Sequence, residues 1–180
     1  MSECSPFAQA LRSNDLLTRV KACSEIGRSL DGHRCLPILK QFVVESSDTN
    51  AEDACVAVRA IGEILRRQAS ASGQKLPVEL AEYVDFLLLQ LEKSNGRYSS
   101  SLIFALCLIG ETGVSQRAIQ AVVNAVARAG YDNRMKYRAY QYACSVKETL
   151  LSIQPWCTFI PPTNTLRDKW DIDRILKDYA

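Results

Sequence analysis

Apolar residues recur at steps of three or four along most of the chain, which is the spacing of one face of an amphipathic α-helix. The segment 16–30 shows this period clearly. Its apolar positions are Leu16, Val20, Cys23, Ile26 and Leu30. Alternating apolar and polar positions flanked by hairpin turns, which would indicate β-strands, are scarce. The chain is therefore predicted to be all-α.

Turn residues divide the helical pattern into eight segments. The pairs Asp31-Gly32 and Asn95-Gly96 interrupt it, and the small residues of 69–75 have the composition of a linker. The predicted helices span about 6–12, 16–30, 33–44, 51–68, 77–93, 99–110, 115–129 and 133–151. The helix at 99–110 is apolar on nearly all sides, so we expect it to be central and covered on both flanks.

A short phrase recurs along the chain. RVKACSEIG occupies 19–27, VAVRAIG occupies 56–62, and SLIFALCLIG closes at Gly110. Each Ile-Gly pair is predicted to end the second helix of a two-helix unit. Units of this length are typical of solenoids, because a lone helix pair cannot bury its apolar face and must stack on neighbours. Small residues are expected to let helices of adjacent units approach closely: Ala22, Ala57, Ala60 and Ala105.

These phrases resemble the second-helix pattern of HEAT and armadillo-like repeats, roughly Val-Arg-x-x-Ala-x-x-x-Ile-Gly. The resemblance covers about 14–150 and is clearest in the first two units, while Ala143-Cys144 replaces Ile-Gly in the fourth. It implies a right-handed α-solenoid of about four antiparallel helical hairpins, whose second helices line a partner-binding surface. A compact eight-helix bundle is the alternative interpretation. We assign 1–153 to the repeat domain.

Residues 154–180 are predicted to form a separate tail. Pro155, Pro161 and Pro162 prevent the preceding helix from continuing. The sequence LRDKWDIDRILKDYA at the end of the chain can form a short amphipathic helix. This tail helix either caps the last unit or docks on another protein. Its candidate contact residues are Trp170, Ile175 and Tyr179.

Composition indicates a soluble, intracellular chain. There are seven cysteines, an odd number without a CxxC pair, and most fall inside apolar helical patterns. We therefore expect buried, reduced thiols and a cytoplasmic location, with a nuclear one possible. The first residues lack the pattern of a secretion signal, and no apolar run approaches the ~20 residues of a membrane helix.

Catalytic and metal-binding patterns are not found in the sequence. A single histidine, His33, excludes a His-rich metal cluster, and we expect it to be exposed at a helix start. His33 and Cys35 would point about 200° apart on a helix, so they are badly placed as a nucleophile pair. No glycine-rich phosphate loop occurs. The chain is predicted not to be an enzyme and to use no cofactor.

The segment YDNRMKYRAYQYACSVK, at 131–147, is the strongest functional candidate. Residues 112–147 hold six Lys or Arg and one acid, whereas 45–63 hold five acids and one Arg, although the net charge is only +2. Arg134 and Arg138 share one helical face. The candidate partner-binding residues are Arg59, Arg66, Arg134, Tyr137, Arg138 and Tyr140.

Three interpretations of this segment remain open. Arginine and tyrosine are enriched at protein–protein hot spots. They also suit nucleic acids, where cations contact phosphates and rings stack on bases. In the third interpretation the tyrosines only bury their rings at the end of the stack. Our main hypothesis is a non-enzymatic adaptor, a subunit of a larger complex that binds a protein partner; a nucleic-acid-binding repeat protein using 131–147 is the alternative. Oligomeric state cannot be predicted from these patterns.

Overall fold

The structure is a computed structural model and describes residues 5–47, 51–73, 75–129 and 133–146. Every regular element in these ranges is helical, which confirms the all-α prediction for them. The α-helices are α1 Ser5–Leu11, α2 Leu16–Arg28, α3 Leu36–Ser46, α4 Ala51–Ala71, α5 Ala81–Lys93, α6 Gly96–Ile109, α7 Gln116–Arg128 and α8 Asn133–Ser145. The predicted tail helix, with Trp170, Ile175 and Tyr179, lies outside the described residues.

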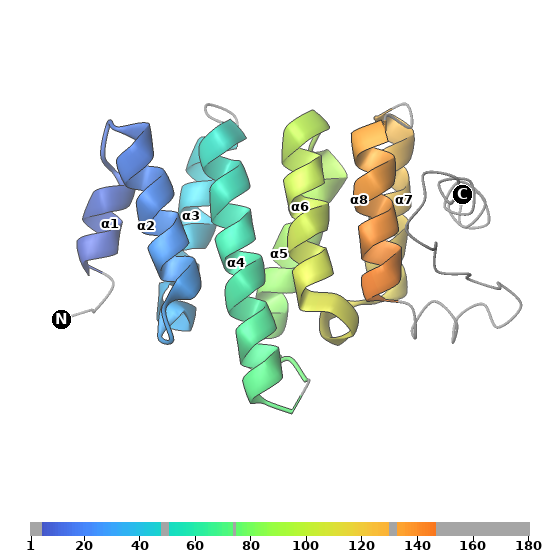
Figure 1. The fold of residues 1–180 in the computed structure, drawn as a ribbon, viewed down its shortest axis with the longest axis horizontal. Coiled ribbons are helices and arrows are strands. Elements are labelled where there is room, and N and C mark those ends of the chain that lie inside the picture. The colour runs from blue at the N-terminus through green and yellow to red at the C-terminus, as the bar shows by residue number, and fades with distance from the viewer. Residues whose placement is uncertain (1–4, 48–50, 74, 130–132, 147–180) are drawn as a thin grey trace, which may run out of the picture.

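The helices form two layers. Figure 1 shows α2, α4, α6 and α8 following one another across the molecule, with α3, α5 and α7 behind them. In the front layer α4 packs between α2 and α6, and α6 packs against α8; α3 packs against α4, while α5 contacts both α6 and α7. The expected central position of the helix at 99–110 is thereby confirmed, because α6 has helices on both flanks.

Local sequence explains where several helices begin. Asp15 caps α2, because its carboxylate accepts hydrogen bonds from the Thr18 amide at 2.9 Å and from the Thr18 hydroxyl at 2.5 Å. These bonds, the hydroxyl bond above all, lower the pKa of Asp15. Ser115 caps α7 in the same way through the Ala118 amide, at 3.2 Å. Two predicted helices, 33–44 and 77–93, instead open as 3-10 turns at Gly32–Cys35 and Val78–Leu80.

Two predicted helix ends were wrong, and a third, at 151, lies outside the described residues, in which α8 ends at Ser145. The α2 helix ends at Arg28, so Leu30, predicted to be the last residue of this helix, lies beyond it and is 88% exposed. The α4 helix continues to Ala71, through the first residues of the predicted 69–75 linker. Its last turn has no apolar face to bury beyond Ala69, and Ser70 and Ala71 are exposed.

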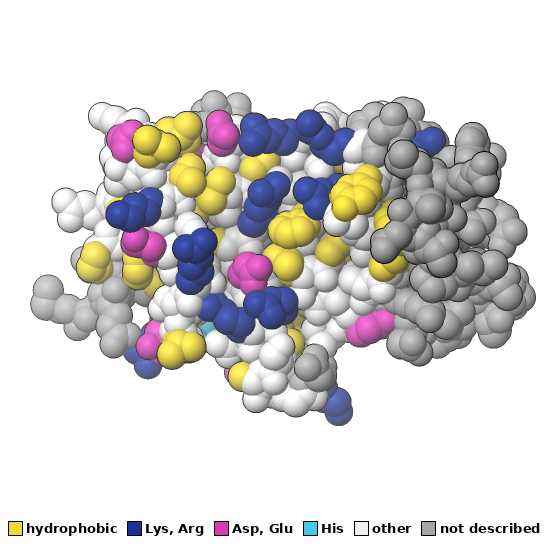
Figure 2. Space-filling model, in the orientation of Figure 1, with side chains coloured by type: hydrophobic (Ala, Val, Ile, Leu, Met, Phe, Trp, Pro, Cys, Tyr) yellow, Lys and Arg dark blue, Asp and Glu magenta, His cyan; other side chains and the backbone are white. Residues whose placement is uncertain are grey.

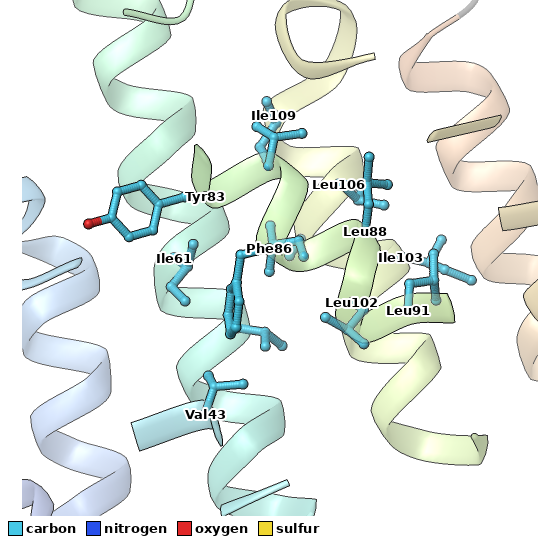
Figure 3. Close-up of a cluster of buried hydrophobic side chains, with 14 of the residues drawn as sticks. Val43, Ile61, Tyr83, Phe86, Leu88, Leu91, Leu102, Ile103, Leu106 and Ile109 are labelled. Carbon is cyan, nitrogen blue, oxygen red and sulfur yellow. The ribbon is translucent and has the colours of Figure 1, made fainter. Parts of the chain in front are cut away.

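The core fills the space between the layers. Side chains from α4, α5 and α6 meet there, and Figure 3 shows Ile61 of α4 near Phe86 of α5 and Leu91 of α5 near Ile103 of α6. The largest fully buried side chains include Leu36, Leu39, Ile61, Leu87, Leu91, Leu102 and Ile103. Burial of each such side chain contributes roughly 1.5–3 kcal/mol, so this continuous apolar core is the main source of stability.

The recurring Ile-Gly phrase marks close helix contacts. A Cβ on Gly27 of α2 would lie 3.3 Å from Ala60 of α4, and one on Gly62 would lie 2.9 Å from Cα and Cβ of Ala105 on α6. The expected close approach at Ala60 and Ala105 is confirmed. The predicted place of Gly62 was wrong, because it lies in the middle of α4 rather than at a helix end. Gly110 does end its helix, with a positive φ of 61°.

The cysteines are in more than one state. Cys23 and Cys55 are buried free thiols, and Cys107 and Cys144 are free thiols with more exposure. Cys35 is disulfide-bonded, which contradicts the expectation of a reduced thiol there. Burial raises the pKa of Cys23 and of Cys107 to about 12. These two sulfurs are therefore held in the protonated, unreactive form.

Thiol alkylation is expected to separate these cysteines. At pH 8 a thiol with a pKa near 12 is only about one part in ten thousand thiolate, and the thiolate is the nucleophile. N-ethylmaleimide should therefore modify Cys144, which is exposed, while Cys23 and Cys107 stay unmodified in the folded protein. Peptide mass spectrometry measures the sites, and the same reaction in guanidinium chloride should label all three. Labelling of Cys23 as fast as Cys144 in the folded protein would contradict this expectation.

Candidate partner-binding surface

One face of the front layer carries a concentration of arginines. Figure 2 shows Lys and Arg side chains gathered over the middle of the face formed by α2, α4, α6 and α8. A pocket of about 450 Å³ opens there between α4, α6 and α8, and we call it the arginine pocket. It is lined by Arg59, Arg97, Ser100, Ser101, Arg134, Tyr137 and Arg138. Four guanidinium groups from three helices therefore meet at one site.

Arg138 is held in place by its neighbours. Its Nε donates to Ser100 Oγ at 3.3 Å, and its Nη1 donates to Gln141 Oε1 at 2.6 Å. Its guanidinium lies 4.8 Å from the centroid of the Phe104 ring, and that of Arg59 lies 5.4 Å from the same centroid. Such cation–π contacts are worth about 0.5–1 kcal/mol at exposed sites. Phe104 of α6 thus positions one arginine from α4 and one from α8.

The positive charge of the arginine pocket is poorly compensated. Its lining contains no carboxylate. Arg97 forms an exposed ion pair, with 3.4 Å between its Nη2 and Glu52 Oε1. Arg59, Arg134 and Arg138 form no ion pair with any residue that the structure describes. Clustered charges of one sign create a local potential that favours an anionic ligand.

Two serines of α6 line the pocket beneath the arginines. Ser100 and Ser101 are 5% and 1% exposed. Ser100 accepts the Arg138 hydrogen bond, but Ser101 Oγ has no hydrogen-bond partner in the described part of the chain. A buried hydroxyl without a partner costs about 1–3 kcal/mol, so native proteins rarely leave one unsatisfied. Ser101 therefore offers an unused donor at this site.

A second depression lies beside the arginine pocket, between α2, α4 and α6. This neighbouring groove shares Arg59 and also includes Val56, Glu63, Arg66 and Leu108. Arg66 is compensated, because its Nη2 lies 3.0 Å from Glu63 Oε2. Another lining arginine, Arg67, donates to the carbonyl oxygen of Gly27 and so joins α4 to α2. The groove is therefore more apolar than the arginine pocket, and it has a carboxylate, Glu63, among its four arginines.

The structure brings together four of the six predicted partner-binding residues. Arg59, Arg134, Tyr137 and Arg138 all line the arginine pocket. Arg66 lines the neighbouring groove instead. Tyr140 lines neither depression and packs partly buried against the core, as the interpretation in which tyrosines bury their rings requires. Tyr137, by contrast, is 53% exposed.

Sequence analysis missed three residues of the pocket. Arg97, Ser100 and Ser101 lie in the first turns of α6, in the stretch RYSSS. Their signal was the step of three or four from Arg97 through Ser100 and Ser101 to Phe104, which places them along one side of a helix. Nothing local to that stretch indicates that this side meets α4 and α8.

Other kinds of site have no support in the described residues. Among them no group of three or more His, Cys, Asp or Glu is arranged to hold a metal ion. None of their helices combines the length and the apolar character needed to cross a membrane. His33 was expected to be exposed, but it is partly buried on the 3-10 turn, with its Nδ1 3.3 Å from Gln68 Nε2.

Comparisons with models of known protein families, with curated proteins and with solved structures gave no match. The resemblance to HEAT and armadillo-like repeats therefore rests on the phrases at 19–27 and 56–62 and on the layered helices.

Proposed function

We propose that the protein is a non-enzymatic adaptor with a HEAT/armadillo-like α-solenoid fold, in which consecutive helices pair as antiparallel hairpins. Its front layer binds an acidic segment of a protein partner. The succession of α2, α4, α6 and α8 in one layer supports the fold, because stacking buries the apolar sides that isolated helix pairs would expose. The small-residue contacts at Gly27 and Gly62 support a regular stacking distance.

The convergence of four arginines on one pocket carries the functional proposal. In a stacked array each successive helix of a layer contributes its own side chains to a shared surface. A segment lying across α4, α6 and α8 would contact an arginine from each of them. Arginine and tyrosine frequently dominate the binding energy of protein interfaces, and Tyr137 stands exposed beside the arginines.

The structure favours a protein over a nucleic acid as the occupant. Binding of unpaired bases uses free aromatic faces for stacking. Of the two aromatic residues that line these depressions, Phe104 is already in contact with two guanidinium groups, which leaves Tyr137 as the exposed ring. The neighbouring groove adds apolar Val56 and Leu108 and the carboxylate of Glu63, which suits peptide side chains better than a phosphate backbone. Nucleic acid remains the second candidate, because the uncompensated charge of Arg59 and Arg134 would also attract phosphates.

Reversing two pocket charges is expected to abolish partner capture. Arg59→Glu with Arg134→Glu should lower recovery of the partner at least tenfold, since hot-spot residues contribute about 2 kcal/mol or more. Both residues lack ion pairs in the described part, so the melting temperature should change little. Affinity capture from lysate, with and without nuclease and quantified by mass spectrometry, measures recovery.

A matched control is Lys75→Glu with Lys93→Glu, which alters net charge equally at exposed positions away from both depressions. Proteins that are lost with the pocket variant, retained with the control and insensitive to nuclease support the adaptor. Equal capture by the wild type, the pocket variant and the control would exclude this surface as the partner-binding site. Loss of every captured protein after nuclease treatment would instead support nucleic acid, with affinity falling steeply as salt rises.

A further inference from the structure

We propose that the arginine pocket binds the phosphoryl group of a phosphorylated serine or threonine in the partner segment. This inference rests on the proposed function, because it specifies the chemistry of the partner at the same surface. The features that carry it are the density of guanidinium groups, the unpartnered Ser101 hydroxyl and the groove that borders the pocket at Arg59.

The charge of the pocket matches a dianion. A phosphoryl group on serine or threonine carries about −1.5 to −2 charges at pH 7 and has three strong acceptor oxygens. Arg59, Arg134 and Arg138 have no carboxylate partner among the described residues, and no carboxylate lines the pocket. A single Asp or Glu side chain would compensate only one of these charges. Guanidinium groups also bind phosphate oxygens in a two-pronged geometry that an ammonium lacks.

The serines supply the remaining hydrogen bonds. Ser101 is one of the residues that line the pocket, it is almost completely buried, and its Oγ has no partner in the described chain. A ligand oxygen that accepts its proton would satisfy this donor. Ser100 and Gln141 already fix the Arg138 guanidinium, and the Phe104 ring supports it from α6. Less side-chain entropy is lost when a ligand meets donors that are already positioned.

The adjacency of the two depressions favours a peptide over a lone anion. Arg59 lines both the arginine pocket and the neighbouring groove, so the two meet at this residue. A chain whose phosphoryl group occupies the pocket can place an adjacent apolar side chain against Val56 and Leu108. Inorganic phosphate would use only the arginines and serines.

Two degenerate peptide libraries test the proposal. They are fluorescein-labelled and identical except that the fixed central residue is phosphoserine in one and serine in the other. Fluorescence anisotropy with the full chain at 0.15 M salt should show at least tenfold tighter binding of the phosphoserine library. Arg134→Gln should remove most of that difference, whereas Lys93→Gln, the same charge change at an exposed residue outside the pocket, should preserve it.

Ser101→Ala separates binding from folding. Removing a buried hydroxyl that has no partner should leave the melting temperature unchanged or slightly higher. If Ser101 donates to the phosphoryl group, the same variant should bind the phosphoserine library about three- to tenfold more weakly. Unchanged affinity of Ser101→Ala would remove the hydroxyl from the site and overturn this part of the proposal.

The remaining outcomes distinguish this inference from the adaptor function. Equal affinity for the two libraries, lost in Arg134→Gln, would overturn phosphoryl recognition but leave an acidic-segment adaptor. If neither library binds but capture from lysate still depends on Arg134, phosphoryl recognition would also be overturned and the adaptor function would stand. Affinity for inorganic phosphate equal to that for the phosphoserine library would indicate a free-anion site instead. A 20-nucleotide oligouridine is added as a competitor for the phosphoserine library. If it displaces the library equally well from the wild-type protein and from Ser101→Ala, both proposals would be overturned in favour of nucleic acid.

Discussion

Replacing Arg19 by methionine is expected to lower the free energy of unfolding by about 3–5 kcal/mol. Arg19 Nε of α2 lies 2.9 Å from Asp53 Oδ2 of α4, and the two side chains are 12% and 5% exposed. Arg19 Nη1 also donates to the Ser13 carbonyl at 2.7 Å. Methionine retains an unbranched apolar side chain but leaves the Asp53 charge buried without a counter-charge. Urea denaturation followed by circular dichroism measures the change.

A double variant tests the cause of this loss. Arg19→Met with Asp53→Leu removes both charges and fills the space with apolar atoms, so most of the lost stability should return. Complete recovery is not expected, because Asp53 also stands in the first turn of α4, where the helix dipole favours a carboxylate by about 0.3–1 kcal/mol. If Arg19→Met alone costs less than about 1 kcal/mol, the pair contributes no more than a surface ion pair.

Leucine at position 62 is expected to cost more than about 3 kcal/mol or to prevent cooperative unfolding. Its Cβ would lie 2.9 Å from both Cα and Cβ of Ala105, and about 1–3 kcal/mol is typical for overpacking by a few atoms. The contact is with the backbone of α6, so no side-chain rotation relieves it. Helix propensity opposes the loss, because Gly is about 1 kcal/mol less favourable than Ala within a helix. Thermal and urea unfolding measure the outcome.

Alanine variants at Gly27 and Gly62 compare the loss of stability that an added Cβ causes at the two helix contacts. Gly62→Ala should still destabilise, whereas Gly27→Ala, whose new Cβ would lie 3.3 Å from Ala60, should be close to neutral. Ala105→Gly in the Gly62→Ala background should recover stability, giving a favourable coupling between the two positions. Equal effects of alanine at 27 and 62 would show that the α4–α6 contact relaxes as easily as the α2–α4 contact.

Sequence periodicity was sufficient for the helices but not for every helix end. The step of three or four located all eight, because burial of an apolar side requires that step wherever a helix meets a core. Leu30 continued the period yet lies beyond the end of α2, because the backbone becomes extended at Ser29. Gly62 looked like a helix stop, but its missing side chain serves a helix crossing that depends on a partner 43 residues away at Ala105.

Most of the pocket residues that were predicted from sequence share one helix. Arg134, Tyr137 and Arg138 stand at helical steps on α8, so their common location followed from sequence. Arg97 and Ser101 line the same pocket because α6 turns this side toward α4 and α8. Tertiary packing sets that orientation, so it does not follow from the sequence of α6 alone. Arg66 was predicted to contact a partner although Glu63, three residues earlier, is a natural ion-pair partner on a helix.

The C-terminal end of α4 extends past the neighbouring helices and offers a site for immobilising the protein. With 21 residues α4 is about 31 Å long, whereas its neighbours α2 and α6 have 13 and 14 residues, and Figure 1 shows its end extending past theirs. Ser70 to Gly73 are exposed there, and inserted sequence is tolerated best where no buried backbone is disturbed. A biotin-acceptor peptide inserted after Gly73 would sit about three helical turns from Arg59. A sensor chip could then hold the chain while the basic surface faces the flowing analyte.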